Sequence, residues 1–307
     1  MPIIDLLKKK KKNMISLLII SFGRCQEVLE TFACVNKYHG KKIELLFLDN
    51  NPARELETAL SSIVENNSSI LFSYFHTGEN LGVAEGRNFL IEKAQGDILI
   101  TLDDDIEIED IILLIQKVTD YMANNAKVGA LAFNIKNYFT RKALSHEIPH
   151  GNKKLDFSQN LLTYYFIGAG HAIRKEVYQK AGFYPKDLGL YGGEERDLSF
   201  RILEAGYQIL YASDIVIYHK VSPNGRMMRK KENFFRYRNQ LIVLNRYMPM
   251  RYRLTSNFVW SIFYLVKMNG EILDIVKVLS EIFSLKRKVV SDKTIRYIKF
   301  VDGRLYY

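Results

Sequence analysis

The first half of the sequence alternates short apolar runs with amphipathic segments, and this alternation limits the possible folds more than any other feature. The apolar runs are almost continuous, as in parallel strands that are buried on both faces of a sheet. The pattern predicts strands at residues 15–20, 43–48, 70–75, 97–102 and 128–134, and helices at 26–38, 54–66, 83–94 and 111–123. Such an alternation predicts an α/β fold with a Rossmann-like, mostly parallel sheet and helices on both faces.

The second half of the chain is more mixed. Residues 136–160 are polar and predict loops and short strands. Beyond them we expect strands at 164–167, 209–211 and 215–218 and helices at 174–181 and 195–204, and from residue 229 to about 288 the pattern is helical and basic. We therefore expect three parts: a basic lead at 1–13, an α/β domain at 14–222 and a helical basic extension at 223–307.

The N-terminal lysines Lys8–Lys12 precede an apolar stretch, residues 14–20, and together they imitate a signal peptide. The stretch is too short for that purpose and no small-residue cleavage site follows it, so we expect a first buried strand. Met14 is an alternative start of translation. No run reaches the ~18 apolar residues of a membrane-spanning helix. The two cysteines form no disulfide framework, so the default setting is cytoplasmic.

The charge is unevenly distributed along the chain. The net charge is +10, yet residues 13–219 carry −7 and residues 220–307 carry +13. A basic extension beside an acidic body predicts an anionic partner. The extension is interpreted as a peripheral contact with an anionic membrane, as a grip on a lipid-diphosphate acceptor, or as a helix that covers the acceptor site with a solvated basic face. Nucleic acid is disfavoured because no recognition module is visible.

Three adjacent carboxylates, Asp103, Asp104 and Asp105, follow an expected strand. Ligands of open α/β sheets bind at the carboxyl ends of the strands. Because adjacent carboxylates repel one another, they favour a hard divalent cation such as Mg²⁺ or Mn²⁺. The alternative is a solvated acidic turn that caps the next helix. His219 closes a later apolar strand and could join carboxylates on Mn²⁺, although a lone histidine is more often structural.

Two further segments contain polar residues that could bind a ligand or take part in catalysis. A glycine-rich turn around Asn80, Gly82 and Arg87 opens a helix, where backbone amides can meet an anion. Glu194 and Glu195 follow a pair of glycines and open another helix. Acids are favoured in a first helical turn by the helix dipole, and the functional alternative is a general base.

Taken in order, these pieces resemble a family 2 glycosyltransferase of the GT-A fold, over about residues 14–250. The motifs that carry the resemblance are Ser21-Phe-Gly-Arg24, Asp49-Asn50, Asn80-x-Gly82-x-Ala84-x-Gly86-x-Asn88, the Asp103–Asp105 triplet, Gly168-Ala-Gly170 with Arg174, Gly193-Glu-Glu-Arg-Asp-Leu-Ser-Phe-Arg201, and His219. The combination of these motifs is far more specific than any one of them alone. Glu195 stands where the family more commonly has aspartate, which lengthens the reach by one methylene.

The resemblance implies a role for each matching residue. Asp49 would bind the base of a nucleotide sugar, and Arg87 its base or phosphate. Asp103 would bind the ribose or another part of the nucleotide, and Asp104 would support either this contact or the metal site. The remaining nucleotide-sugar contacts would come from Ser21, Arg24, Asn80, Gly82 and Asn88. Asp105 and His219, with Asp103, would hold the metal. Glu195 would be the catalytic base, with Glu194 as the second candidate. Gly168, Gly170, Asp197 and Arg201 would lie on the acceptor side.

The resemblance also implies the reaction. We expect an inverting, Mn²⁺- or Mg²⁺-dependent transfer of a hexosyl or rhamnosyl group from a nucleoside-diphosphate sugar, with UDP or dTDP favoured over GDP. The acceptor would be a glycan or lipid-linked glycan of bacterial surface polysaccharide synthesis, such as capsule or O-antigen. The alternatives are a nucleotidyltransferase that makes nucleotide sugars, which would want a more basic first loop, and a non-catalytic glycan- or nucleic-acid-binding protein.

Overall fold

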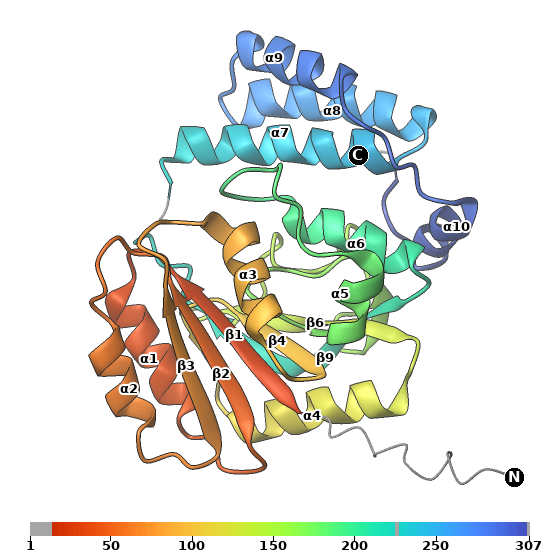
Figure 1. Cartoon of the computed structure of the whole chain (residues 1–307). Helices are drawn as coiled ribbons and strands as arrows, with labels where there is room; N and C mark the ends of the chain where they lie inside the picture. The colour runs from red at the N-terminus through yellow and green to blue at the C-terminus, as the bar shows by residue number, and fades with distance from the viewer. Residues whose placement is uncertain (1–13, 225–226, 306–307) are drawn as a thin grey trace, which may run out of the picture.

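The computed structural model describes residues 14–224 and 227–305, and the predicted basic lead at 1–13 lies outside the described residues. One central sheet has helices against both of its faces, and a further group of helices lies at one end of the molecule (Figure 1). The strand order is β3-β2-β1-β4-β8-β6-β9-β5, and β7 also pairs with β9. The α/β class expected from the alternation of apolar runs is confirmed.

The predicted parallel strands form one side of the sheet. They are β1 (Ile15–Ser21), β2 (Ile43–Asp49), β3 (Ile70–His76) and β4 (Ile98–Leu102). β1 pairs in parallel with β2 and β4, and β2 pairs in parallel with β3. Because these strands run the same way, the polar segments that follow β2 and β4 meet at one edge of the sheet.

The other side of the sheet is mixed. β6 (Val128–Asn137) runs parallel to β9 (Gln208–His219), and β8 (Gly170–Arg174) lies antiparallel between β4 and β6. The short strands β5 (Ile106–Glu107) and β7 (Leu161–Thr163) both pair antiparallel with β9. The expectation of a mostly parallel sheet therefore describes the β3-β2-β1-β4 side and not this one.

Two strand predictions are corrected. The apolar residues 164–167 are not a strand: Tyr164, Tyr165 and Phe166 are buried in the core as an unpaired segment between β7 and β8. The predicted strands at 209–211 and 215–218 are one strand, β9, in which the register with β6 shifts between Phe133 and Asn134. Polar residues in this bulge break the apolar run and imitate a turn.

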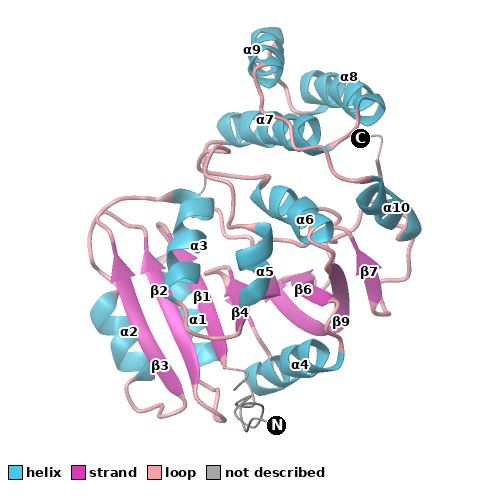
Figure 2. Ribbon diagram, turned by 45° about the vertical axis from the view of Figure 1, so that its right-hand side comes forward, coloured by secondary structure: helices cyan, strands magenta, loops and turns pink. Residues whose placement is uncertain are grey.

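Each face of the sheet has its own hydrophobic core. Figure 2 shows helices on both sides of the sheet. Helices α1 (Cys25–Val35), α2 (Glu57–Val64) and α4 (Ile111–Asn124) cover one face. Helices α3 (Gly82–Lys93), α5 (Lys175–Ala181) and α6 (Glu194–Glu204) cover the other. The prediction of helices on both faces is confirmed, and α3 and α6 begin at the carboxyl edge where the acidic residues lie.

The C-terminal extension is helical, as predicted. α7 (Arg229–Tyr247), α8 (Met250–Lys267) and α9 (Ile272–Phe283) lie together beyond the sheet (Figure 1). α10 (Asp292–Phe300) returns to pack against α6. The side-chain amide of Asn239 on α7 donates hydrogen bonds to the carbonyls of Leu188, Tyr191 and Gly192. α7 therefore holds the loop that leads into α6.

Candidate active site

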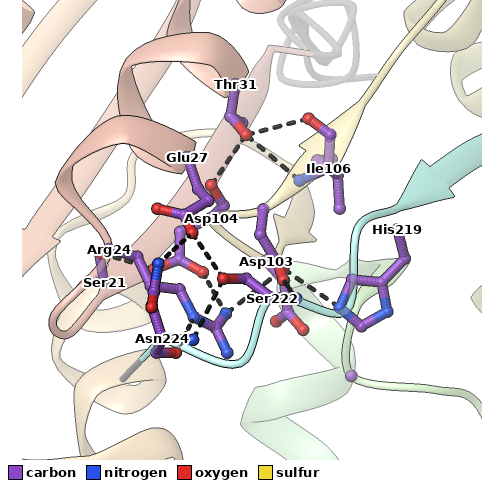
Figure 3. Close-up of polar contacts among 12 residues, drawn as sticks. Ser21, Arg24, Glu27, Thr31, Asp103, Asp104, Ile106, His219, Ser222 and Asn224 are labelled. Atoms are coloured by element: carbon purple, nitrogen blue, oxygen red, sulfur yellow. Dashed lines mark hydrogen bonds and ion pairs between the residues drawn. The ribbon is translucent and has the colours of Figure 1, made fainter. Parts of the chain in front are cut away.

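The three aspartates after β4 make different contacts. Asp104 is buried: its Oδ2 accepts a 2.5 Å hydrogen bond from Ser21 Oγ, and its Oδ1 accepts one of 2.7 Å from Arg24 Nη1 (Figure 3). Burial raises the pKa of Asp104 to about 7, although the charge of Arg24 opposes the rise. Asp104 therefore ties the end of β1 to the loop after β4.

Asp105 is fully buried beside His219, at the end of β9. Its Oδ1 lies 3.1 Å from His219 Nε2, and its Oδ2 accepts a 2.8 Å hydrogen bond from the backbone N–H of Ser222. Burial alone would raise the pKa of Asp105, but contact with His219 outweighs it and lowers the pKa to about 2. His219 Nδ1 also pairs with the buried Glu147. Burial alone would lower the pKa of His219, but Asp105 and Glu147 together raise it to about 10.

Asp103, Asp105 and His219 fit a divalent cation. Each offers one ligand atom, and these atoms lie within 4.8 Å of one another. The buried Oδ1 of Asp105 faces His219 Nε2 at 3.1 Å and Arg24 Nη1 at 3.4 Å, but neither contact within the described residues has hydrogen-bond geometry, as fits an oxygen that would instead face a cation. Glu147 contacts the other ring nitrogen of His219. Carboxylates in this position commonly orient the histidines that bind metal ions. Two carboxylates and an imidazole suit Mn²⁺, and carboxylates also suit Mg²⁺.

A buried arginine, Arg87 on α3, lies among three carboxylates. Its Nη1 is 3.3 Å from Glu194 Oε1 and 3.3 Å from Glu195 Oε1, and its Nη2 is 3.3 Å from Asp103 Oδ1. Nη2 also donates a 3.2 Å hydrogen bond to the carbonyl of Gly168. Burial raises the pKa of Glu194 well above its ordinary value, and the charge of Glu195 adds to the rise. Arg87 thus joins the start of α6 to the aspartates after β4.

The two glutamates at the start of α6 differ in access. The Glu195 side chain is 21% exposed and the Glu194 side chain 5%. Glu195 Oε1 approaches Gly168 so closely that a Cβ at Gly168 would lie 2.2 Å from it. α6 begins after Gly193, whose φ of +91° is a left-handed conformation that favours glycine. The sequence therefore places a partly open carboxylate against a glycine loop.

A cavity of about 420 Å³ lies at the carboxyl edge of the sheet, and cavities of about 300–1,000 Å³ are usual for small ligands. It is lined by Ile20, Ser21, Phe22, Arg24, Asn50, Asn80, Gly82, Val83, Arg87, Asp103, Asp104, Leu190, Tyr191, His219, Met227 and Glu232. Most of the residues predicted to contact a nucleotide sugar are therefore brought together here. Asn80 shapes the wall, because its Oδ1 accepts a 2.8 Å hydrogen bond from the backbone N–H of Gly82.

Two residues predicted to bind the nucleotide lie away from this lining. Asp49 is fully buried: its Oδ1 accepts a 2.9 Å hydrogen bond from the N–H of Asn51, and its Oδ2 accepts one of 2.6 Å from the hydroxyl of Tyr74. The Asn88 side chain exchanges two 2.9 Å hydrogen bonds with the backbone of Tyr184. In this arrangement both side chains hold loops in place, and their roles in nucleotide binding stay predictions.

Three residues predicted for the acceptor side also lie elsewhere. Buried Asp197 accepts hydrogen bonds from Arg201 at 2.8 Å and from Arg246 at 2.6 Å, which ties α6 to α7. A Cβ at Gly170 would lie 2.2 Å from Ile217 Cδ1, so this glycine permits close strand packing. Within the described part of the chain, none of Asp197, Arg201 and Gly170 lines the cavity. Of the four predicted acceptor-side residues, Gly168 is the one placed against Glu195.

Sequence reasoning missed several residues of the site. Glu147 lies in the polar segment 136–160, and its partner His219 is 72 residues away, so no local pattern marks it. Asn50 belongs to the quoted motif Asp49-Asn50, but only Asp49 was given a role; Asn50 is the residue of the pair that lines the cavity. Met227 and Glu232 reach the cavity from the C-terminal extension.

The open α/β sheet and the acidic, cation-compatible edge beside a ligand-sized cavity define a class: the chain has the GT-A fold of glycosyltransferases. Residues 16–182, more than half of the chain, match the family described as "Glycosyl transferase family 2", and the chain belongs to this family.

The chain has sequence relatives in Haemophilus influenzae, and one of them is described as a glycosyltransferase. A Haemophilus influenzae protein, described as "Uncharacterized protein", is 89% identical over 185 residues, which are 60% of this chain and 100% of the relative. A second H. influenzae protein, described as "Uncharacterized glycosyltransferase", is 27% identical over 120 residues, 39% of this chain and 38% of the relative.

Solved structures share the fold at low identity. The mannosyltransferase PcManGT from Pyrobaculum calidifontis, in complex with GDP-Man and Mn²⁺, gives a TM-score of 0.59 at 13% identity, covering 93% of this chain and 78% of that one. GalNAc-T7 with UDP, GalNAc and Mn²⁺ gives 0.63 at 15%, covering 94% and 56%. Residues 1–349 of S. aureus TarS with UDP-GlcNAc give 0.62 at 11%, covering 95% and 89%. At these identities the likeness establishes the fold alone.

None of the helices within residues 14–224 and 227–305 has both the length and the apolar character needed to cross a bilayer.

Proposed function

We propose that this glycosyltransferase moves a sugar from a nucleoside-diphosphate sugar to a hydroxyl of a glycan or lipid-linked glycan, with inversion and with a divalent metal. The observation that carries the proposal is that Asp103, which lines the cavity, belongs to two groups. With Asp105 and His219 it forms the cation-compatible set, and through Arg87 it is linked to Glu195. A metal site beside a partly exposed carboxylate is what the transfer requires.

Asp103, Asp105 and His219 would hold Mn²⁺ or Mg²⁺. Bound there, the ion would supply positive charge to the diphosphate of the departing nucleotide. Glu147 would keep the His219 ring in position through its Nδ1. This role for Glu147 rests on its contact with His219 and on the burial of its side chain.

The chain's own residues would bind and orient the donor. Arg24 lies on the cavity wall and carries a charge that can meet a phosphate. Arg87 lines the same cavity and lies at equal distances from Asp103 and Glu195, so it fixes the Glu195 carboxylate relative to the donor site. Asn50 and Asn80 add neutral polar groups to the wall.

Glu195 would act as the base. Its carboxylate would accept the proton of the acceptor hydroxyl while that oxygen attacks the anomeric carbon from the side opposite the diphosphate. The bond between the anomeric carbon and the diphosphate oxygen breaks as the new bond forms, so the configuration inverts in a single displacement. The greater exposure of Glu195 favours it over the buried Glu194.

The finer assignment of substrates rests on family likeness. We favour UDP or dTDP over GDP, a hexosyl or rhamnosyl group, and an acceptor of bacterial surface polysaccharide synthesis. The fold neighbours carry either GDP-Man or UDP compounds, so they do not favour one nucleotide over another. We place the enzyme in the cytoplasm, peripheral on the inner face of the plasma membrane, where such an acceptor would be presented.

The proposal is tested by melting temperature against UDP, dTDP, GDP and CDP, each with Mn²⁺ and with EDTA. A ligand at about 100 times its dissociation constant stabilises the native state by about 2.7 kcal/mol. We expect a metal-dependent rise with one nucleotide, lost in Asp105→Ala. Absence of a rise with every nucleotide would contradict the donor site.

The base is tested in the same protein with the sugar form of that nucleotide. Glu195→Gln should keep metal-dependent nucleotide binding and lose transfer. Glu92→Gln, at an exposed carboxylate of α3, is the matched control and should keep both. Near-normal turnover of Glu195→Gln would remove Glu195 from the mechanism.

A further inference from the structure

Ten large apolar side chains of α8 and α9 are exposed, and together we name them the α8–α9 face. Its members are Leu254, Phe258, Val259, Ile262, Phe263, Val266, Ile272, Leu273, Val276 and Phe283. Phe258 is 69% exposed, Leu273 78% and Phe283 90%. Single exposed apolar residues are ordinary, but a contiguous group of this kind marks an interaction site.

The face is built by helical spacing. Leu254, Phe258, Ile262 and Val266 recur every four residues along α8, so they lie in one row. The opposite side of α8 is also apolar and packs on α7, where the ring of Tyr264 stacks on Tyr237 at 4.3 Å. α8 therefore needs only one of its two apolar sides for folding, and the outer row is free for a partner.

The charges around this face are basic. Residues 229–288 contain thirteen Lys or Arg and four Asp or Glu, and α8 itself has no acidic residue. The acidic residues of this region already have partners. Glu271, which precedes α9, pairs with Lys230. Within α9, Asp274 accepts a 2.6 Å hydrogen bond from the hydroxyl of Tyr264, and Glu281 pairs with Arg238.

Exposed lysines and arginines remain near both ends of the helices. They include Arg251 and Lys267 at the two ends of α8 and Lys286 and Lys288 after α9. An apolar row bordered by such cations is the pattern of helices that lie in the interface of a bilayer. Each Lys or Arg near an anionic surface adds to the attraction between the protein and the membrane.

We infer that the α8–α9 face docks on an anionic lipid bilayer, with its apolar side chains in the headgroup and acyl boundary. The partner is argued from charge: a second copy of the chain would bring two strongly basic surfaces together, which opposes association. A membrane with anionic lipids supplies both the apolar medium and the opposite charge. The inference deepens the proposed function, on which it rests for the role of the cavity.

Docking would also orient the active site. Met227 and Glu232 line the cavity, and Glu232 lies in the first turn of α7, the helix on which α8 and α9 pack. The same α7 holds the loop before α6 through Asn239. A face docked through α8 and α9 therefore fixes the height of the cavity above the lipid, which suits an acceptor whose lipid end stays in the bilayer.

The test is flotation of the full chain with vesicles of phosphatidylcholine alone and of phosphatidylcholine with phosphatidylglycerol. We expect binding to the anionic vesicles, and a fall of roughly tenfold or more in partitioning for Phe258→Glu/Ile262→Glu, because two apolar side chains no longer enter the bilayer. Leu113→Glu changes a similarly exposed leucine on α4 and should bind as the unaltered chain does.

The electrostatic part is tested with Lys267→Glu/Lys286→Glu against Lys127→Glu, an exposed lysine on the other side of the fold. The first should weaken binding to anionic vesicles and the second should not. Absence of flotation with anionic lipid, or unchanged flotation of Phe258→Glu/Ile262→Glu, would overturn the inference. So would a dimer of the unaltered chain that becomes a monomer in this variant without any lipid binding.

Metal-dependent nucleotide binding is measured without lipid in the same variants. If it is retained while flotation is lost, the docking surface and the donor site are separate, as inferred. If the unaltered chain floats but binds no nucleotide, the proposed reaction fails and the docking surface stands.

Discussion

Gly168→Ala is the substitution whose effect on the site can be worked out most directly. A Cβ at Gly168 would lie 2.2 Å from Glu195 Oε1 and 2.7 Å from Arg87 Nη2. Ordinary contacts begin near 3.4 Å, so the Glu195 carboxylate must retreat by about 3.4 − 2.2 = 1.2 Å. The retreat moves the carboxylate relative to Arg87 and Asp103, which define its place beside the cavity.

Gly168→Ala should reduce the rate of turnover and leave the stability of the fold almost unchanged. A misplacement of about 1 Å in a catalytic group can cost roughly 100-fold in rate. Both atoms in the way are the ends of flexible side chains, and glycine to alanine restricts the unfolded chain, so we expect a stability change of about 1 kcal/mol or less. We therefore predict a kcat reduced roughly 100-fold with nearly unchanged nucleotide affinity and melting temperature.

The assay is release of nucleoside diphosphate in the presence of Mn²⁺ and acceptor, with the nucleotide that stabilises the chain. Glu195→Asp supplies a matched second change, since its carboxylate is one methylene shorter and leaves room for the new Cβ. The loss caused by Gly168→Ala should be smaller in the Glu195→Asp background, and this coupling is measured as a double-mutant cycle. Near-normal kcat for Gly168→Ala, or equal losses in both backgrounds, would refute the reasoning.

Three further predictions concern groups that support the site. Glu147→Gln removes the carboxylate charge that faces Nδ1 of His219 and should weaken Mn²⁺ binding roughly 10- to 100-fold, measured by calorimetry. Arg246→Met removes one partner of buried Asp197 and should lower the free energy of unfolding by about 3 kcal/mol, measured in urea. The raised pKa of Glu194 means that the folded state keeps a proton that the unfolded state loses above about 4.5, so stability falls as the pH rises from there. Glu194→Gln should flatten this fall in melting temperature.

The parallel side of the sheet was predictable because its signals are local. A strand buried on both faces must be apolar throughout, and β2 is buried at every position. The polar residues that end such strands then lie on one edge, which is why the Asp103–Asp105 triplet was expected at a ligand site; the place of His219 beside it was implied by the family resemblance. The aromatic segment 164–167 has the same apolar signal without a pairing partner, so composition alone could not separate it from a strand.

The contacts within the site were less predictable because they depend on long-range packing. Asp49 follows β2 as a nucleotide-binding aspartate would, yet Asn51 and Tyr74 occupy its oxygens in the folded chain. Asp197 has the sequence position of a site residue, but Arg246 reaches it from a helix 49 residues later. Sequence spacing gives the element on which a side chain lies, and the neighbouring elements decide what it contacts.

The charge balance of the site gives an independent physical reason to expect a cation. Six carboxylates gather at this edge: Asp103, Asp104, Asp105, Glu147, Glu194 and Glu195. Among the described residues, the cationic groups in contact with them are Arg24, Arg87 and His219, which are fewer than the carboxylates. Burial, with the charges of neighbouring carboxylates, raises the pKa of Asp104 and of Glu194, and Asp105 and Glu147 raise the pKa of His219. A divalent ion would supply positive charge at the same place without a bound proton. The mutual repulsion of the carboxylates would thus be relieved by the ion that the proposed reaction needs.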